Sequence, residues 1–381
     1  MSFSLSSLSS LFVKETKSVL GVDIGTSSVK IVQLRREQGR VVLETYGAIA
    51  LGPYAEVEIG RATSLPGEKI AEALKDVIRE ANVTTNDAAI SIPYTSSLIS
   101  IIKLPAAVEK QLAQVVPIEA RKYIPVPIQE VMLDWFVVGK TEPSDKKTPI
   151  QLEVLLVAIH NDTVGKFRAI SNDSLLQTAF LEIEVFSAVR ASLDHGIAPV
   201  AVVDMGAATT KFYVVERGLI RESHIISHGS QDLTLAASRS LNITVAQAEE
   251  KKRRFGIGTH SPPELKNTLE LTLNPFLSAL SRTITSYEQR SNQSLGTLVV
   301  TGGGATLKGF KEFAQTKIQT EIRLADPFSK TQAPAFLEPI LKEAGPEFSV
   351  AVGLALRAVG VSWYEPIGDA ELFMRAAELA V

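Results

Sequence analysis

The chain contains no cysteine among its 381 residues, which excludes a disulfide framework and a thiolate metal site. Aromatic residues make up only 6% of the sequence, and no apolar run approaches the roughly 18 residues that a membrane span requires. The excess of one charge over the other is also small: the formal net charge is −3, so the chain has no overall positive field to attract nucleic acid or anionic lipid. We therefore expect no nucleic-acid partner and no membrane span in the chain itself.

What the chain has is length and apolar content. With 381 residues, of which 45% are hydrophobic, it can form two or more hydrophobic cores. The first ten residues are rich in serine and lack the basic start and compact apolar stretch of a secretory signal. Residues 1–16 are interpreted as a flexible tail or as a short amphipathic helix that docks on a partner or membrane surface, and both interpretations remain open.

Two distant stretches of the chain are nearly the same. Residues 22–30 read Val-Asp-Ile-Gly-Thr-Ser-Ser-Val-Lys, and residues 203–211 read Val-Asp-Met-Gly-Ala-Ala-Thr-Thr-Lys. Each predicts a β-hairpin whose tip has a carboxylate, a glycine and exposed backbone N–H groups. The carboxylate can hold a hydrated divalent cation, and two such tips facing each other would hold a nucleotide's phosphates. Taken singly, each motif is also compatible with a tight turn and nothing more.

Both halves of the chain open with a strand, an Asp-x-Gly turn and a second strand, which indicates an internal duplication. Pro66 opens a helix in the first half, with apolar residues at helical spacing up to residue 81. The last clear helix is expected over residues 349–359. The expected strands are residues 17–23, 29–34, 41–49 and 88–92 in the first half, and 201–204, 210–216, 219–226 and 297–300 in the second half.

A different unit interrupts the first half at residues 93–178. Its pattern predicts a strand over 98–104, a helix over 106–123 bent near Pro117, and two further strands over 131–138 and 152–159. The prolines at 125 and 127 predict an extended segment from Tyr123, and Asn161 is a candidate cap of a following helix. We interpret this unit as an inserted α+β subdomain.

Three further groups are candidates for a site. The triple glycine at residues 302–304 follows an apolar strand and permits backbone contact with a flat ring or a phosphate, unless it is only a flexible turn. Glu249 and Lys252, at i and i+3 on one helix, could hold ribose hydroxyls and cover an adenine, or they could form a solvated surface pair. Glu182 or Glu184 could orient a water for attack on a terminal phosphate, or both could face solvent from a strand.

These elements, in this order, resemble the actin, sugar-kinase and heat-shock-chaperone ATPase superfamily. Within it the chain is most similar to the PilM family of type IV pilus assembly proteins, and the similarity covers nearly the whole chain after residue 17. The residues that carry it are 21–30, 119–125, 248–252 and 302–304.

The resemblance implies an α/β protein with the duplicated actin-like ATPase fold, in which two halves surround a cleft for ATP and Mg²⁺. The inserted subdomain would be of the type found in FtsA and PilM. The implied division is a first core subdomain (17–92, 179–198 and 357–381), the insert (93–178), a second core subdomain (199–241 and 297–356) and a helical subdomain (242–296).

The resemblance also assigns roles to residues. Asp23 and Asp204 would hold Mg²⁺ through waters, and backbone N–H groups at 25–27 and 206–208 would cradle the phosphates. The candidate catalytic residues are Glu184, Glu182 and Asp204, but none is an unambiguous general base, so hydrolysis is expected to be weak or absent. The expected nucleotide contacts are Asp23, Gly25, Thr26, Ser27, Ser28, Lys30, Asp204, Gly206, Ala207, Ala208, Thr209, Glu249, Lys252, Gly302, Gly303, Gly304 and Thr306.

For partners, the resemblance implies that a groove beside the insert receives the cytoplasmic N-terminal peptide of PilN, an inner-membrane protein. Residues 106–123 and the following strand are the candidate groove wall. The chain would then act in the cytoplasm at the inner face of the inner membrane, linked to the pilus motor ATPases and to twitching motility. One departure from the family is Gly229-Ser230, where Gly-Gly is common.

Two alternatives remain open at this stage. A small-molecule kinase of the same superfamily would need a polar substrate pocket in the first half. An FtsA-like filament former would need a basic amphipathic C-terminal helix, and residues 371–378 are amphipathic but hardly basic.

Overall fold

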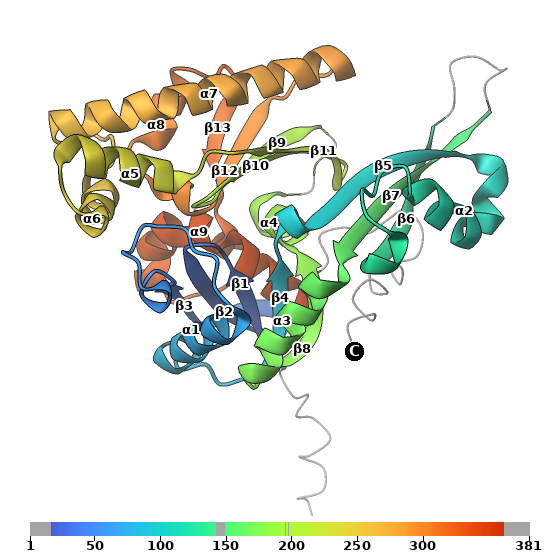
Figure 1. Cartoon of the computed structure of the whole chain (residues 1–381), viewed down its shortest axis with the longest axis horizontal. Helices are drawn as coiled ribbons and strands as arrows, with labels where there is room; N and C mark the ends of the chain where they lie inside the picture. Colours follow the sequence, from blue (N-terminus) through green and yellow to red (C-terminus); the bar gives the residue numbers. More distant parts are fainter. Residues whose placement is uncertain (1–16, 142–148, 195, 197, 362–381) are drawn as a thin grey trace, which may run out of the picture.

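The computed structural model describes residues 17–141, 149–194, 196 and 198–361 of the chain. It contains two five-stranded sheets and a smaller three-stranded sheet (Figure 1). The serine-rich N-terminal stretch and the amphipathic segment 371–378 lie outside the described residues. None of the helices that the structure describes combines the length and the apolar composition of a membrane span.

The first sheet has the strand order β3-β2-β1-β4-β8. β1 is antiparallel to β2 and parallel to β4. The turn between β2 and β3 has two residues with positive φ, Gln38 at 49° and Gly39 at 81°, which is the left-handed geometry that a tight hairpin prefers. Helix α1 packs Ile70, Leu74 and Val77 against this sheet, as the apolar spacing predicts. The bounds are β1 (Ser18–Ile24), β2 (Ser28–Glu37), β3 (Arg40–Ala50), η3 (Pro53–Ala55), α1 (Gly67–Glu80), β4 (Asp87–Ile92) and β8 (Gln177–Ile183).

The second sheet repeats the first, with the order β11-β10-β9-β12-β13. The repeat extends to register: Asp23 lies opposite Lys30, and Asp204 lies opposite Lys211. The predicted duplication is therefore present in the pairing of the strands. The short edge strand β13 was not predicted, because three of its four residues are exposed and it lacks a clear apolar pattern. The bounds are β9 (Val200–Met205), β10 (Thr210–Glu216), β11 (Leu219–Ile226), β12 (Thr297–Thr301) and β13 (Glu321–Leu324).

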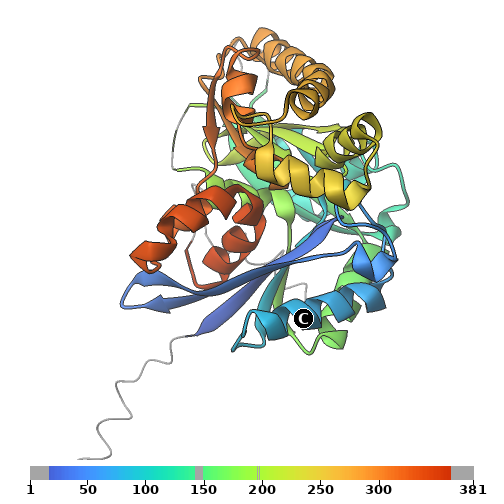
Figure 2. The same ribbon diagram turned by 90° about the vertical axis from the view of Figure 1, so that its left-hand side faces the viewer.

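Helices cover the second sheet on the side away from the first half (Figure 2). The long helix α7 forms one edge of the molecule, beside α5 and α6 (Figure 1). Helix α6 begins with a capping box, in which the Thr244 hydroxyl accepts the Gln247 N–H and the Gln247 side chain accepts the Thr244 N–H. The bounds are α5 (Ser230–Leu241), α6 (Val245–Phe255), α7 (Pro263–Ser291), η7 (Gly303–Thr306), α8 (Phe310–Gln315), η8 (Pro327–Lys330) and η9 (Ala335–Leu337).

Two helices cross between the halves, α4 (Glu184–Ser192) and α9 (Glu338–Ala358). They pack closely because Gly353 has no side chain: a Cβ there would lie 1.9 Å from the Ser187 carbonyl oxygen. Helix α9 begins eleven residues before the predicted start at residue 349. Gly345 and Pro346 have low helix propensity, but both are buried inside the helix, so tertiary packing overrides that propensity.

The inserted unit forms the third sheet, β5-β7-β6. The helix predicted over 106–123 is wrong in its extent: residues 106–111 form a 3-10 helix and the α-helix ends at Ala120. Tyr123, predicted to begin an extended segment, instead lies in a turn in which its N–H donates to the Ala120 carbonyl, and its side chain is 43% exposed. Asn161 is the first residue of α3 rather than its cap. The bounds are η4 (Tyr94–Ser96), β5 (Ser97–Pro105), η5 (Ala106–Gln111), α2 (Leu112–Ala120), η6 (Ile128–Glu130), β6 (Val131–Thr141), β7 (Gln151–His160) and α3 (Asn161–Asp173).

Candidate functional site

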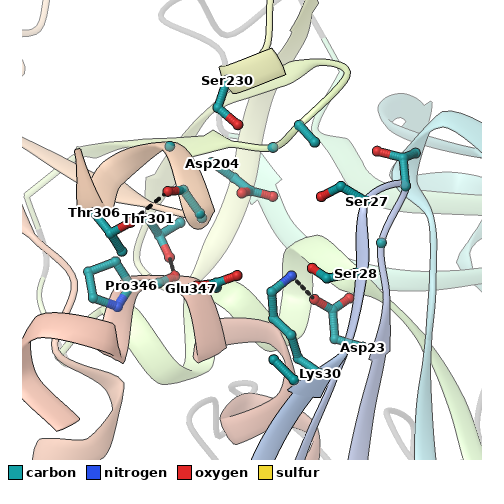
Figure 3. A pocket seen from close by; sticks show the side chains of 18 of the residues that line it. Asp23, Ser27, Ser28, Lys30, Asp204, Ser230, Thr301, Thr306, Pro346 and Glu347 are labelled. Carbon is teal, nitrogen blue, oxygen red and sulfur yellow. Dashed lines mark hydrogen bonds and ion pairs between the residues drawn. The ribbon is translucent and has the colours of Figure 1, made fainter. Parts of the chain in front are cut away.

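A cavity of about 880 Å³ lies between the two halves. Both Asp-x-Gly turns, the triple glycine, α6 and α9 contribute to its walls. Every residue that the sequence analysis assigned to the site lines this cavity, with the exception of Glu182. Figure 3 shows Asp23 and Asp204 on facing walls of the same space, each at the end of a strand.

Asp23 is held at the end of β1. Its Oδ1 accepts a hydrogen bond from the Ser91 hydroxyl at 3.0 Å. Its Oδ2 lies 3.7 Å from the Lys30 ammonium on the neighbouring strand, and both side chains are largely buried. The turn therefore presents one carboxylate and one ammonium to the cavity.

Asp204 is held more tightly, because Lys211 bridges it to the first half of the chain. Lys211 Nζ lies 3.1 Å from Asp204 Oδ2 and 2.8 Å from Glu184 Oε2. The other Glu184 oxygen accepts the backbone N–H of Tyr94 at 2.7 Å. Burial raises the pKa of Glu184, and the nearby Asp204 and Asp23 raise it further, against the opposing effect of Lys211. Burial opposes a charged Lys211, but Asp204 and Glu184 outweigh it and raise the pKa of the ammonium.

The backbone N–H groups of the two turns divide into two kinds. The Gly25 N–H donates to the Ser28 carbonyl at 3.0 Å, and the Gly206 N–H donates to the Thr209 carbonyl at 3.1 Å. These glycine N–H groups close the turns, so the expectation that they face a ligand is wrong. Among the described residues, the N–H groups of the next two positions in each turn have no acceptor, and they remain available to an anion. These positions are 26, 27, 207 and 208.

The triple glycine is shaped by close packing. Gly302 has φ 85°, and a Cβ there would lie 2.3 Å from Asp204 Oδ1; a Cβ on Gly304 would lie 2.7 Å from the Met205 Cβ. Gly303 has no such close neighbour, with Glu347 Oε1 nearest at 3.7 Å. The segment is a 3-10 turn rather than a flexible loop, and Thr306 Oγ1 donates to the Gly303 carbonyl within it.

Glu249 and Lys252 form a buried pair, so the solvated-pair alternative is excluded. Lys252 Nζ lies 2.6 Å from Glu249 Oε2, and the Thr234 hydroxyl donates to the same oxygen at 2.6 Å. Arg253 donates to the other carboxylate oxygen at 2.7 Å. Burial acts to raise the pKa of Glu249, but Lys252 and the hydrogen bonds outweigh it and lower the pKa to about 2. Burial lowers the pKa of Lys252.

Glu182 lies outside the cavity, contrary to its assignment as a candidate catalytic group. It is 5% exposed, and it accepts hydrogen bonds from Ser187, from Arg190 at 2.7 and 2.8 Å, and from Arg357. Burial acts to raise its pKa, but Arg190 and Arg357 outweigh it and lower the pKa to about 2. This cluster joins α4 to α9, and it leaves Glu182 no access to a substrate.

Several lining residues were missed by the sequence analysis. Lys211 is the clearest, because the repeat itself could have found it: it follows Asp204 at the spacing by which Lys30 follows Asp23. Arg253 and Thr301 adjoin predicted residues. Glu347 lies on the part of α9 that was not predicted to be helical.

A loop of the first half crosses to the second half beside the cavity. Glu58 Oε2 accepts the Ala246 N–H at the start of α6 at 2.9 Å, and the Ala62 N–H donates to Gln231 Oε1 at 3.0 Å. Gly60 has φ 102°, and a Cβ there would lie 2.9 Å from the Glu249 Cβ. The two halves are thus in contact on this side of the cavity as well as at Lys211.

The two matching sheets, the crossing helices and the shared cavity define the class: this is an actin-like ATPase fold. Among solved structures, the PilM-PilN type IV pilus biogenesis complex is similar with a TM-score of 0.74 and 23% identity, over 90% of this chain and 98% of that chain. The ethanolamine utilization protein EutJ from Carboxydothermus hydrogenoformans has a TM-score of 0.55 and 17% identity, over 92% of this chain and 96% of that one.

The family follows from the sequence comparison. The family described as "Type IV pilus assembly protein PilM" matches residues 21–359, and the chain belongs to this family. The cell division protein FtsA of Bacillus subtilis (strain 168) is 20% identical over 352 residues, which cover 81% of this chain and 78% of the relative. The predicted fold class and family are both confirmed.

Proposed function

We propose that the protein is an ATP-binding scaffold of type IV pilus assembly that binds the cytoplasmic N-terminal peptide of PilN. The observation that carries the proposal is the position of Asp23 and Asp204 on facing walls of one cavity in a member of the PilM family. The similarity to the PilM-PilN type IV pilus biogenesis complex supports PilN as the partner. The link to the pilus motor ATPases at the inner face of the inner membrane belongs to the same proposal.

The cavity's residues fit a triphosphate with Mg²⁺. Its volume of about 880 Å³ lies within the usual range of roughly 300–1,000 Å³ for ligand sites. The free N–H groups of the two turns and the ammonium groups of Lys30 and Lys211 suit phosphate oxygens. Asp23 and Asp204 would hold Mg²⁺ through waters, and the ion would neutralise phosphate charge. Glu249 and Lys252 would lie beside the nucleoside.

The same geometry favours slow hydrolysis. Glu184 is the candidate base that lines the cavity, and each of its oxygens already accepts a hydrogen bond, one from Lys211 and one from the Tyr94 N–H. These two donors fix the orientation of the carboxylate and oppose its turning toward a water, which a general base must hold in hydrogen-bond reach. The enzyme activity we propose is therefore weak or absent, and binding is the main role of the nucleotide.

A route of contacts joins the cavity to the inserted subdomain. Tyr94, which donates its N–H to Glu184, also places its hydroxyl against the Ser223 hydroxyl of β11. Arg221 in β11 pairs with Glu153 of β7 at 2.7 Å. A nucleotide that changes the angle between the halves would therefore move the insert, and with it the partner groove.

The candidate groove wall includes α2 and the turn after it, where Ile118 is 64% exposed and Tyr123 is 43% exposed. An extended peptide would use backbone pairing and such apolar side chains. The test is a titration of the full chain with a synthetic PilN N-terminal peptide, with and without ATP–Mg²⁺, and with a scrambled peptide as control. We expect saturable binding of the first peptide alone, at an affinity that ATP–Mg²⁺ changes; no affinity under either condition would contradict the proposal.

A further inference from the structure

The cavity contains one carboxylate that differs from all its neighbours. Among the residues that the structure describes, six acidic side chains line the cavity, and five of them have a partner: Asp23, Glu184, Asp204, Glu249 and Glu343. Glu347 is half-buried, and the described residues give it neither a hydrogen bond nor an ion pair; its charge interacts only at longer range, with Lys252 and Arg253. A carboxylate placed in this way has all its acceptor positions free for a ligand that donates hydrogen bonds.

Glu347 is held in place by its backbone. The carbonyl of the preceding residue, Pro346, accepts the Gly302 N–H at 2.8 Å and the Thr301 hydroxyl at 2.9 Å. The helix at this point is therefore fixed to the end of β12 and the start of the triple glycine. Figure 3 shows the Glu347 side chain pointing from α9 into the cavity. The backbone that carries Glu347 is thus fixed before a ligand binds, and only the torsions of the side chain remain to be ordered.

Its position along the cavity limits which part of a nucleotide it can meet. Gly302 lies against Asp204 and the next residue, Gly303, lies against Glu347, so the two carboxylates are neighbours along one wall. Glu343 lies one turn closer to the start of α9, and Ile340 lies two turns closer. The Glu343 side chain is 71% exposed and Ile340 is 54% exposed, so these residues mark the outer rim of the cavity. Glu347 thus lies between the end where the phosphates would bind and the rim.

We propose that Glu347 accepts hydrogen bonds from the sugar hydroxyls of the bound nucleotide and so makes the cavity select ribonucleotides over deoxyribonucleotides. The proposal rests on the proposed nucleotide binding. Phosphate oxygens carry negative charge and only accept hydrogen bonds, so they cannot satisfy the acceptor oxygens of Glu347, and Lys252 and Arg253 offset its negative charge only at longer range. Ribose hydroxyls donate without charge, and a carboxylate that accepts from them is a common means of holding a ribose.

The test is a set of binding titrations on the purified full chain with ATP, 2′-deoxy-ATP and 3′-deoxy-ATP, each with Mg²⁺. A hydrogen bond to a charged group contributes enough that loss of one hydroxyl should weaken binding by about 10-fold or more. Glu347→Gln should weaken ATP binding by about 10-fold. The affinity for whichever deoxy analogue binds more weakly to the wild-type chain should stay nearly unchanged, because that analogue already lacks the hydroxyl that Glu347 accepts from. The matched control is Glu343→Gln, one turn away on the same helix, which should preserve the preference for ATP.

The titrations separate a failure of the nucleotide proposal from a failure of the proposed role of Glu347. Absence of ATP binding by the wild-type chain overturns the nucleotide proposal itself. If the wild-type chain binds ATP, 2′-deoxy-ATP and 3′-deoxy-ATP with equal affinity, only the proposed role of Glu347 is overturned, and this comparison needs no variant. An equal loss for all three nucleotides in Glu347→Gln, or a change in Mg²⁺ dependence without a change in sugar preference, also overturns it.

Discussion

The two Asp-x-Gly turns begin from almost the same sequence and end in different surroundings. In the first turn, Lys30 lies 3.7 Å from Asp23 and both belong to one half of the molecule. In the second turn, Lys211 lies within 3.1 Å of Asp204 and 2.8 Å of Glu184, which begins α4 in the other half. The hairpin geometry is local and repeats, whereas the bridge depends on how the halves meet. The second turn therefore both lines the cavity and joins the two halves of the molecule.

The largest expected effect comes from removing that junction. Lys211→Met leaves two buried carboxylates without their cation, and breaking a buried pair in this way costs about 3–5 kcal/mol. Lys30→Met should cost less, about 1–3 kcal/mol, because Asp23 keeps its hydrogen bond from Ser91. Urea unfolding of both variants gives the comparison directly. Equal losses in the two variants would mean that the bridge adds nothing to the second turn.

A second comparison concerns Glu182 and Glu184, which are two residues apart. In a strand they would face the same side, but β8 ends at Ile183 and α4 begins at Glu184, so the two side chains separate. Glu182 pairs with Arg190 and Arg357 and its pKa is lowered to about 2, whereas burial raises the pKa of Glu184. The carboxyl groups of Glu182 and Glu184 are therefore expected to shift in opposite directions from the usual pKa of a glutamate.

Glu182→Gln should remove a pH-dependent part of the stability. A carboxylate with a lowered folded-state pKa stabilises the protein above its unfolded value of 4.5 and loses this effect as the pH falls toward about 2. The contribution is of the order of 3 kcal/mol at neutral pH. We expect the unfolding free energy of the variant to be lower at pH 7 and to depend less on pH between about 5 and 3. A pH profile parallel to that of the wild type would show that the cluster does not act through ionisation.

The smallest effect on stability is expected for Tyr94→Phe, which keeps the backbone N–H that bonds Glu184 and removes only the hydroxyl beside Ser223. The loss should be about 1 kcal/mol or less. If the route through β11 joins the halves to the insert, the effect of ATP–Mg²⁺ on peptide affinity should shrink by a few-fold. Ser223→Ala is the matched control, because it removes the other member of the same contact and should have the same result. An unchanged effect of ATP–Mg²⁺ in both variants would exclude this route.

The sequence predicted the parts of the fold that rest on local pattern. The two hairpins, α1 and the order of these elements along the chain follow from strand alternation, helical spacing and the repeat. It missed features that depend on tertiary packing, such as the early start of α9 through Gly345 and Pro346 and the end of α2 at Ala120. In the site, the repeat led to both acidic turns, but only the structure separates Glu182 from the cavity and brings Glu347 into it.

Calorimetric titration of ATP into wild-type, Asp23→Asn and Asp204→Asn chains shows whether Asp23 and Asp204 hold one nucleotide between them. We expect wild-type binding to require Mg²⁺ and each substitution alone to weaken it by at least about 10-fold, since each removes one of two acidic groups around the same ion. Binding that survives either substitution unchanged, or no binding by the wild-type chain, would overturn the proposed nucleotide site.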